Sequence, residues 1–349
     1  MCPPPCSMQD IARRFGVHPS TVSRALRNDP TISQDMRERV QAAARDLGYK
    51  PNPLISALVR SRRPRRSGSY RAHLGYLFAG PVDRARVWRR NYDELFFGAK
   101  ARANMLGYEL EEFDLSGRDL SPKRFTQILL TRNIHGLILP PLYSLQDSLP
   151  VEWDHFGVIA IGHSHRIPAN RVVHNHFAAM RTALAACRAR GRQRIGLVLT
   201  RRLHEKVEKL WLASYVFDHF EQADRCEARP LLLMEDRNDA ARFDVWLKQN
   251  RPDAIIGLQN LTPIHAWVKT AGLASEIELV TLDYHESDRG FSGVFHDYGR
   301  IGATAVDQLV GQLERNERGL PRMPVSTLID GVWIERATDA QREKSERKK

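Results

Sequence analysis

The stretch MQDIARRFGVHPSTVSRALRNDP, residues 8–30, places two short segments with helical periodicity on either side of a tight turn. Ile11, Ala12 and Phe15 share one face of the first segment. Gly16 suits the left-handed turn that ends a helix, and Pro19 suits the first position of the next one. The pattern therefore predicts two short helices that meet at a sharp angle.

The second segment, PSTVSRAL, separates its apolar residues from its polar ones. Helical spacing turns one set of side chains toward a core: Val22, Ala25 and Leu26. The opposite face then holds small hydroxyl side chains and one arginine, Arg24. The function of the segment depends on what this polar face contacts.

A third helix is predicted directly afterwards. Ser33 is a good N-cap, and Asp35 falls in the first turn, where a negative charge is favourable. The expected buried stripe ends just before Gly48 and consists of Val40, Ala43, Ala44 and Leu47. Residues 8–50 are therefore predicted to form an all-α headpiece of three helices that contains a helix-turn-helix.

We expect residues 51–60 to form a further, very short helix and residues 61–72 to form a basic linker. In YKPNPLISALVR, Asn52 can cap a helix and Pro53 can begin it. Isolated helices shorter than ~12 residues are marginal in water, so this one should form only when something packs against it. The run from Ser61 to Ala72 is rich in arginine and contains proline and glycine.

The positive charge of the chain is concentrated near its N-terminus. The whole chain has a net charge of +12. Residues 1–72 hold 14 Lys and Arg against 5 Asp and Glu, a net +9, which leaves +3 for residues 73–349. A short cationic region on a nearly neutral body favours contact with a polyanion. Nucleic acid fits better than a membrane, because no lipid anchor or hydrophobic helix accompanies the charge.

From His73 onward, short apolar runs alternate with amphipathic segments. The runs are HLGYLFA, YELEEF, HGLILP, FGVIAIG, RIGLVL, RPLLLM, DAIIGL, ELVTLD and GVF. The predicted helices span 93–106, 177–189, 206–220, 242–249, 264–271 and 301–313. Such alternation is typical of parallel sheets flanked by helices. Because residues 73–336 exceed the usual size of one such sheet, we expect a two-lobed α/β body with a ligand cleft at the carboxyl ends of the strands.

Composition disfavours several classes of protein. No run of about 18 apolar residues exists, and MCPPPCSMQD lacks the apolar core of a signal peptide, so we expect a cytoplasmic protein without membrane contact. The cysteines are too few and too scattered for a disulfide framework: Cys2, Cys6, Cys187 and Cys226. Residues 1–7 and the charged residues 337–349 are expected to be disordered.

The segment DIARRFGVHPSTVSRALRNDPTISQDMRERVQAAARDLGYKPNP resembles, almost position for position, the DNA-binding headpiece of the lactose-repressor/galactose-repressor (LacI/GalR) family of bacterial transcription regulators. The remainder is similar to the family's periplasmic-binding-protein-like effector domain, through RGRQRIGLVL, LVTLD, GVFHDYGRIGATAVDQLV and GVWIERAT. The resemblance implies a homodimeric repressor that binds a near-palindromic double-stranded DNA operator. It also implies a small-molecule effector, with carbohydrates among the candidates, and lobe crossings near residues 174, 296 and 330.

The resemblance further assigns DNA contacts. PSTVSRAL becomes the recognition helix, in which Arg24 would meet a guanine or a phosphate in the major groove. Residues 51–60 become a hinge helix whose Leu58 would wedge into the central base step from the minor groove. The alternatives are an ordinary surface helix for TVSRAL and packing of Leu58 against the body. The predicted DNA-binding residues are His18, Pro19, Ser20, Thr21, Ser23, Arg24, Asn28, Tyr49, Asn52, Ile55 and Leu58.

The expected effector cleft departs from the family pattern. Aligned on LVTLD, Asp283 matches a carboxylate that accepts hydrogen bonds from ligand hydroxyls, and His296 falls where a glutamine is common. Positions that the pattern fills with polar side chains or an arginine hold other residues here: Pro140, Gly162, Leu258 and Lys209. A cleft short of polar groups binds polyhydroxylated sugars poorly, because each hydroxyl that loses water needs a partner.

Two interpretations of the cleft stay open. Either the ligand differs, or its contacts have moved to side chains that can stack on a sugar ring, drawn from Tyr76, Trp88, Tyr92, His163 and Trp211. Core packing is the alternative for each aromatic alone, and a strand-end cap is the alternative for Asp283. The arginine-rich RARVWRRNYDE could instead hold an anionic effector. The predicted effector-binding residues are Tyr76, Tyr92, His163, Lys209, Trp211, Asp283 and His296.

Two other functions compete with regulation of transcription. A metal-dependent enzyme is suggested by two His-x-His pairs, His163/His165 and His174/His176, which could supply imidazole ligands. No acidic residue of a catalytic motif lies beside them, and no Walker loop, nucleophile elbow or GxGxxG opens a strand, so we predict no enzyme, no cofactor and no metal site. A solute-binding protein for transport shares the two-lobed body but is disfavoured by the missing signal peptide and the basic headpiece.

Overall fold

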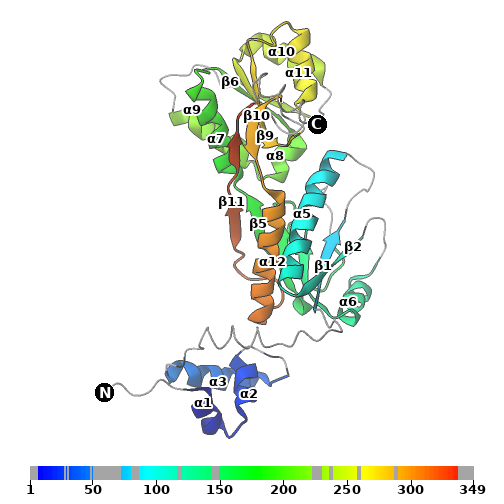
Figure 1. Cartoon of the computed structure of the whole chain (residues 1–349), viewed down its shortest axis with the longest axis vertical. Helices are drawn as coiled ribbons and strands as arrows, with labels where there is room; N and C mark the ends of the chain where they lie inside the picture. Colours follow the sequence, from blue (N-terminus) through cyan, green and yellow to red (C-terminus); the bar gives the residue numbers. More distant parts are fainter. Residues whose placement is uncertain are drawn as a thin grey trace, which may run out of the picture.

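The computed structural model contains a small helical headpiece and a two-lobed α/β body (Figure 1). It describes residues 7–26, 29, 31–47, 49, 72–79, 86–115, 120–142, 149–221, 230–235, 239–257, 261–286 and 290–336. For residues 86–89 and 219 it describes the backbone alone. The predicted hinge and nearly all of the predicted linker therefore lie outside the described residues, as do Asn28, Gly48, Asn52, Ile55, Leu58 and Leu258.

The headpiece consists of three short helices: α1 (Met8–Phe15), α2 (Pro19–Leu26) and α3 (Gln34–Asp46). Ser7 is the N-cap of α1 and forms a capping box with Asp10. Gly16 ends α1 with a φ of 63°, which confirms the predicted left-handed turn. Ser33 caps α3 as predicted.

A small apolar core joins these helices. Its buried members are Ile11, Ala12, Val22, Ala25, Val40 and Ala44, with Phe15 and Leu26 packed against them. Gln41 on α3 donates from its side-chain amide to the carbonyl oxygen of Ala25 at 3.1 Å, which holds α3 against the end of α2. The prediction that Leu47 is buried is wrong: α3 ends at Asp46, and Leu47, its C-cap, is 38% exposed.

The body contains two six-stranded sheets, one in each lobe. The strand order is β11-β5-β4-β3-β1-β2 in the first sheet and β12-β10-β9-β8-β6-β7 in the second. Neighbouring strands are parallel in every pair except β10 and β12. The first-sheet strands are β1 (Ala72–Phe78), β2 (Tyr108–Asp114), β3 (Ile134–Leu139), β4 (Gly157–Ile161), β5 (Asn170–His174) and β11 (Ser326–Ile329). The second-sheet strands are β6 (Ile195–Thr200), β7 (Leu231–Met234), β8 (Ala254–Gly257), β9 (Glu278–Tyr284), β10 (Ser292–Phe295) and β12 (Val332–Ile334).

Helices cover both faces of the first sheet, because its strands direct alternate side chains into two cores. Ile159 and Ile161 of β4 point into the core under α5 and α12. Val158 and Ala160 point into the opposite core, under α6. The helices of this lobe are α5 (Arg86–Met105), α6 (Pro122–Thr131) and α12 (Tyr298–Glu314).

The second sheet is built in the same way. Leu197 and Leu199 of β6 point into the core that contains residues of α7 and α9, and Val198 points into the core under α10 and α11. The helices of this lobe are α7 (His176–Ala189), α8 (Arg201–Lys206), α9 (Leu210–Glu221), α10 (Ala240–Asn250) and α11 (Thr262–Thr270), and a 3-10 turn, Trp153–His155, belongs to the first lobe. No helix in the described part of the chain is both long and apolar enough to cross a bilayer.

The chain passes between the lobes three times, and the three connections touch one another (Figure 1). The connections lead from β5 to α7, from β10 to α12 and from β11 to β12. Asn175, on the first, donates to a carboxylate oxygen of Asp330, on the third, at 2.7 Å. The rings of His174 and His296, on the first and second, have their centroids 4.3 Å apart. A movement of one connection therefore disturbs the others.

All the apolar runs predicted as strands form strands, namely β1 to β4 and β6 to β10. The sequence pattern misses β5, β11, β12, α6 and α8. Strands β11 and β12 lie at sheet edges and hold exposed or half-buried residues, so no apolar run marks them. The predicted helix 206–220 is wrong at its start, because Lys206 ends α8 and Glu208 and Lys209 adopt left-handed φ angles of 52° and 62° before α9 begins.

Replacing Gly302 by Ala should destabilise the first lobe, because the new Cβ would lie 2.1 Å from the carbonyl oxygen of Leu95 on α5. A backbone atom cannot move aside cheaply, so we expect the free energy of unfolding to fall by more than about 2 kcal/mol. Gly311 on the same helix is the control, because a Cβ there first meets the flexible end of Arg315 at 3.2 Å. Gly311→Ala should be neutral or stabilising by up to about 1 kcal/mol. Urea unfolding followed by circular dichroism compares the two, and equal effects would contradict this packing.

Candidate DNA-binding face and inter-lobe pocket

The polar face of α2 presents the side chains that the sequence predicts for DNA contact. Val22 and Ala25 are buried in the headpiece core, which fixes how the helix is rotated. The outer face is then made of exposed His18, Ser20 and Arg24, flanked by half-buried Pro19, Thr21 and Ser23. A short helix anchored on one side, with small polar side chains on the other, has the shape that enters a major groove.

His18 caps the N-terminus of α2. Its Nδ1 atom accepts a hydrogen bond from the backbone N–H of Ser20 at 3.2 Å, and the Oγ of Ser20 lies 2.8 Å from the same Nδ1. A ring nitrogen that accepts these bonds has no proton of its own, so in the neutral ring Nε2 bears it. His18 thus orders the first turn of α2 and keeps an N–H donor at Nε2.

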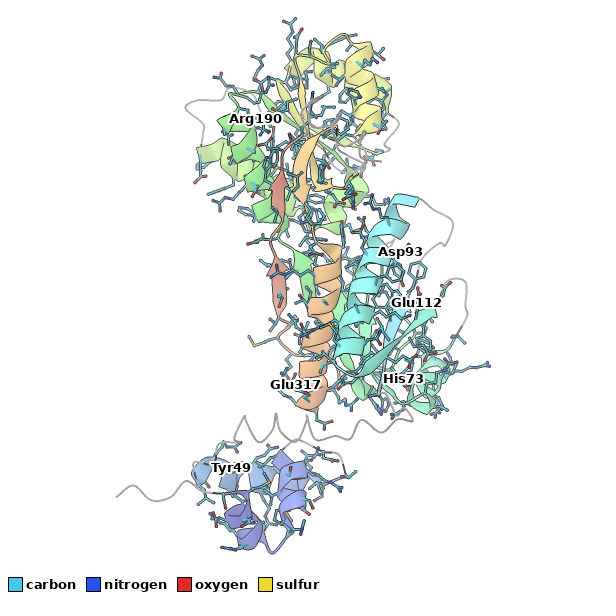
Figure 2. The ribbon with its side chains drawn as sticks, in the orientation of Figure 1. Tyr49, His73, Asp93, Glu112, Arg190 and Glu317 are labelled. Atoms are coloured by element: carbon cyan, nitrogen blue, oxygen red, sulfur yellow. The ribbon has the colours of Figure 1, made fainter. Side chains whose placement is uncertain are left out.

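Tyr49 follows α3 in the headpiece (Figure 2). Its backbone N–H donates to the carbonyl oxygen of Ala44 at 2.9 Å, and its ring is half-buried against the headpiece core. The structure therefore gives this predicted DNA-binding residue a packing role. Exposed arginines surround the core on all three helices: Arg13, Arg14, Arg24, Arg39 and Arg45.

A pocket of about 110 Å³ lies between the two lobes of the body. The first lobe contributes α5 and the turn after β4, and the second contributes α8, the start of α9 and the end of β9. Residues in or next to the connections between the lobes complete the lining: His174, His176, His296 and Tyr298. The pocket thus lies at the carboxyl ends of parallel strands, where the fold class predicts a ligand cleft.

Asp283 links the two lobes at this pocket. It lies on β9 of the second lobe and is 4% exposed. The hydroxyl of Tyr298, on α12, lies 2.9 and 3.0 Å from the two carboxylate oxygens, and the side-chain amide of Asn91, on α5, donates to Oδ2 at 3.3 Å. Both oxygens of this buried carboxylate therefore have partners supplied by the first lobe.

His285 is a further neighbour of the carboxylate. Its Nε2 lies 3.6 Å from Oδ1 of Asp283, and its ring stacks on Tyr298 with an interplanar angle of 9°. Burial alone would lower the pKa of His285, but its hydrogen bond and charge attraction to Asp283 raise that pKa above its usual value. His285 thus adds positive charge beside the carboxylate when it is protonated.

Four more histidines line the pocket: His163, His174, His176 and His296. Their ring centroids are separated by 5.9 Å for His163 and His176, 5.7 Å for His174 and His176, and 4.3 Å for His174 and His296. Burial lowers the pKa of all four, most strongly for His174 and His176, and the neighbouring imidazoles lower those two further. The pocket is therefore lined by neutral imidazoles.

The hydrogen bond of His296 sets which of its nitrogens is protonated. Its Nε2 lies 3.1 Å from the carbonyl oxygen of Leu282, an atom that can only accept, so Nε2 holds the proton in the neutral ring. The other ring nitrogen, Nδ1, is then an acceptor. Position 296, where a glutamine is common in the resembling family, thus supplies one donor and one acceptor here.

The structure brings five of the seven predicted effector residues to the pocket: Tyr92, His163, Trp211, Asp283 and His296. The other two are elsewhere. Tyr76 is fully buried in the core under α5, edge-to-face against Tyr92 and Phe96. Lys209 lies in the left-handed turn before α9, and it is Lys206, at the end of α8, that lines the pocket. Contact of any of these residues with an effector stays a prediction.

Sequence reasoning missed Asn91 and Tyr298. Asn91 lies inside α5, where nothing in RARVWRRNYDE distinguishes it from its arginine neighbours. Tyr298 does have a signal, because it follows the strand and crossing GVFHD. Gly162 and Pro140 are positions that depart from the family pattern. Gly162 lines the pocket and has a φ of 77°. The carbonyl oxygen of Pro140 lies 2.7 Å from Nε2 of His165.

The two His-x-His pairs do not form one cluster. His165 is buried away from the pocket lining, with its Nε2 at the carbonyl oxygen of Pro140, whereas His163, His174 and His176 line the pocket. Nδ1 of His163 pairs with a carboxylate oxygen of Glu208 at 3.2 Å. Within the described residues, no group of three or more His, Cys, Asp or Glu side chains could hold a metal ion.

Comparison with known sequences finds relatives over part of the chain. Residues 7–52 match the profile of the family described as "Bacterial regulatory proteins, lacI family". The chain is 31% identical over 133 residues to the HTH-type transcriptional repressor CytR of Escherichia coli strain K12. The aligned stretch covers 38% of this chain and 35% of CytR. It is 42% identical over 57 residues to the HTH-type transcriptional regulator MalR of Streptococcus pneumoniae, 16% of this chain and 17% of that protein. These matches span about a third or less of the relatives' length.

Comparison with solved structures extends over the whole fold. The lac repressor dimer bound to operator and the anti-inducer ONPF matches with a TM-score of 0.57 at 20% identity, covering 95% of this chain and 98% of that one. The complex of the transcriptional regulator CelR with cellobiose matches with a TM-score of 0.58 at 16% identity, covering 95% and 99%. At this identity the likeness establishes the fold: a helix-turn-helix headpiece followed by a two-lobed, periplasmic-binding-protein-like α/β domain.

The buried neutral histidines predict a loss of stability in mild acid. Burial lowers the pKa of His165 to about 4, and the pKa values of the pocket histidines are lowered too, so below pH ~6.5 the unfolded chain binds more protons than the folded one. The contribution of these neutral histidines to the free energy of unfolding should be fully present above pH ~6.5. It should fall as the pH drops toward 4, by about 1.4 kcal/mol per pH unit for each extra proton that the unfolded chain binds. His285, whose pKa is raised, opposes this trend by one proton at most.

Urea midpoints measured between pH 7.5 and 5 test this prediction, because most carboxylates stay ionised over that window. His165→Gln should reduce the slope, while the same change at exposed His155 should leave the slope unchanged. A midpoint that does not move between pH 7.5 and 5 would show that these histidines are not held neutral.

Proposed function

We propose that the whole protein is a sequence-specific DNA-binding repressor, because residues 7–52 match the family described as "Bacterial regulatory proteins, lacI family". It acts as a homodimer on a near-palindromic operator, and a small molecule bound between the lobes modulates its affinity. The observation that supports this most is the outer face of α2, where His18, Ser20 and Arg24 stand exposed on a helix anchored by the headpiece core. Two such helices related by a two-fold axis match two half-sites.

The body supplies the route by which a ligand would act. Its pocket touches residues of both lobes and of the connections between them. A ligand that binds one lobe arrangement better than the other shifts the balance between them by its difference in affinity, typically ~1–3 kcal/mol. In the proposed regulator this shift changes the spacing of the two headpieces and thereby the affinity for the operator. The contribution of residues 51–60, including Leu58, stays a prediction.

The direct experiment is selection of bound DNA from a random pool by the full-length protein. The proposal expects enrichment of one near-palindromic sequence, and mass measurement of the complex should give two chains per site. A pool that stays random after selection would contradict the proposal.

Binding to the selected operator should weaken steeply with salt. Residues 1–72 hold a net +9, and each phosphate that a Lys or Arg neutralises releases condensed counterions. A plot of log K against log salt should therefore be linear, with a slope of several units per dimer. Fluorescence anisotropy with labelled operator between about 50 and 200 mM salt measures the slope. Affinity independent of salt would show that the basic N-terminal region does not contact the DNA backbone.

Replacing Arg24 by Ala should cost about 1–3 kcal/mol of operator affinity and relax the preference at one base pair of each half-site, if the guanidinium forms a bidentate contact with a guanine. Arg45→Ala is the matched control, because Arg45 is also exposed but lies in the last turn of α3, away from the outer face of α2. Repeating the selection with both variants measures affinity and preference together. Uniform weakening over all sequences by Arg24→Ala would assign this arginine to a phosphate instead.

A further inference from the structure

The size of the inter-lobe pocket limits its ligand. The volume of about 110 Å³ is comparable with the roughly 150 Å³ of an engineered apolar cavity that binds benzene. A hexose has a hydroxyl or hydroxymethyl group on nearly every ring carbon and needs more room than one aromatic ring. The described lining therefore fits one small ring.

The polar atoms of the pocket can hold a hydroxyl group. The carboxylate of Asp283 already accepts from Tyr298 and Asn91. The buried lining atoms that lack a hydrogen-bond partner include Nε1 of Trp211, Oδ1 of Asn91 and Nδ1 of His174, His176 and His296. A ligand hydroxyl beside Trp211 and Asn91 would find one donor and one acceptor there.

The walls of the pocket are aromatic. The rings of His176 and Trp211 meet edge-to-face with centroids 4.7 Å apart at 76°, and the rings of His174 and Tyr298 do so at 4.7 Å and 73°. Rings arranged in this way present both faces and edges, so a planar ligand gains stacking and edge-to-face contacts that a puckered polyol does not. Aromatic side chains thus favour an aromatic ligand.

The charges that line the pocket nearly cancel. Lys206 is 9% exposed and Asp283 is 4% exposed, and both line the pocket. The pocket histidines are neutral near pH 7, because burial lowers their pKa. Among the lining residues that the structure describes, one positive and one negative side chain give no net attraction for an anion. The electrostatics of the described lining therefore favour a neutral ligand.

We propose that the inter-lobe pocket binds a small, neutral, single-ring aromatic molecule with one hydroxyl group, the chemical class of phenol. In this arrangement the indole N–H of Trp211 donates to the hydroxyl oxygen, and the side-chain oxygen of Asn91 accepts the hydroxyl proton. The inference rests on the proposed function, because that function makes this pocket the effector site.

Titration calorimetry of the full-length protein without DNA tests the proposal with four probes: phenol, cyclohexanol, benzoate and glucose. Phenol should bind with one molecule per chain and at least fivefold more tightly than cyclohexanol, which has the same hydroxyl on a saturated ring. Benzoate should bind more weakly than phenol, and glucose should show no saturable binding. Equal affinity for phenol and cyclohexanol, or tighter binding of glucose or benzoate than of phenol, would overturn the proposal.

Two variants locate the binding. Trp211→Phe keeps a ring but removes the indole N–H, and it should weaken phenol binding at least fivefold. Trp246→Phe is the matched control, because Trp246 also has a buried indole N–H without a partner but lies on α10 in the core on the far side of the second sheet. Leu203→Trp, which fills the pocket from α8, should abolish phenol binding and serves if Trp211→Phe does not fold. Phenol affinity unchanged by Trp211→Phe or by Leu203→Trp would refute the assignment.

Failure of this inference is distinguishable from failure of the proposed function. A preparation that selects a specific DNA sequence but does not bind phenol refutes the ligand class alone. A preparation that selects no DNA sequence refutes the proposed function, whatever its affinity for phenol. Adding phenol to the operator complex then measures whether occupancy of the pocket changes DNA affinity.

Discussion

The close packing of α5 against α12 is the contact on which the inter-lobe site depends. A Cβ on Gly98 would lie 2.1 Å from the carbonyl oxygen of Gly299, so the two helix backbones meet with no side chain between them. This approach brings Asn91, near the start of α5, to within 2.8 Å of the hydroxyl of Tyr298, the first residue of α12. Both side chains can then reach Asp283 in the other lobe only because the helices are this close.

The buried carboxylate of Asp283 ties the two lobes together. An ionised carboxylate that loses water is stable only when other groups replace its hydrogen bonds. Here the donors come from the first lobe and the acceptor from the second, so the closed arrangement is favourable only when the two lobes align to within hydrogen-bond distance.

The headpiece and the strands could be predicted because their signals are local. Gly16, Pro19 and Ser33 act within a few residues of themselves. Short continuous apolar runs mark the strands, which are buried on both faces. The pocket could not be predicted to the same degree, because its members come from distant segments. Tyr76, one of the residues predicted for the effector cleft, lies on a strand, and nothing in the sequence tells an aromatic strand residue of the core from one of the cleft. The packing of α5 over the sheet shows that Tyr76 belongs to the core. Lys209 is turned out of the pocket by the left-handed turn, which the helical periodicity of 206–220 conceals.

The pocket and the connections between the lobes are parts of one packed unit. A Cβ on Gly331, in the third connection, would lie 2.9 Å from Cε1 of His296 in the second, so the absence of a side chain at 331 is what lets these segments lie together. His296 in turn packs on His174 of the first connection, and both rings line the pocket. Because interiors packed at this density transmit displacement rather than absorb it, a shift of either ring would displace the segments that join the two lobes.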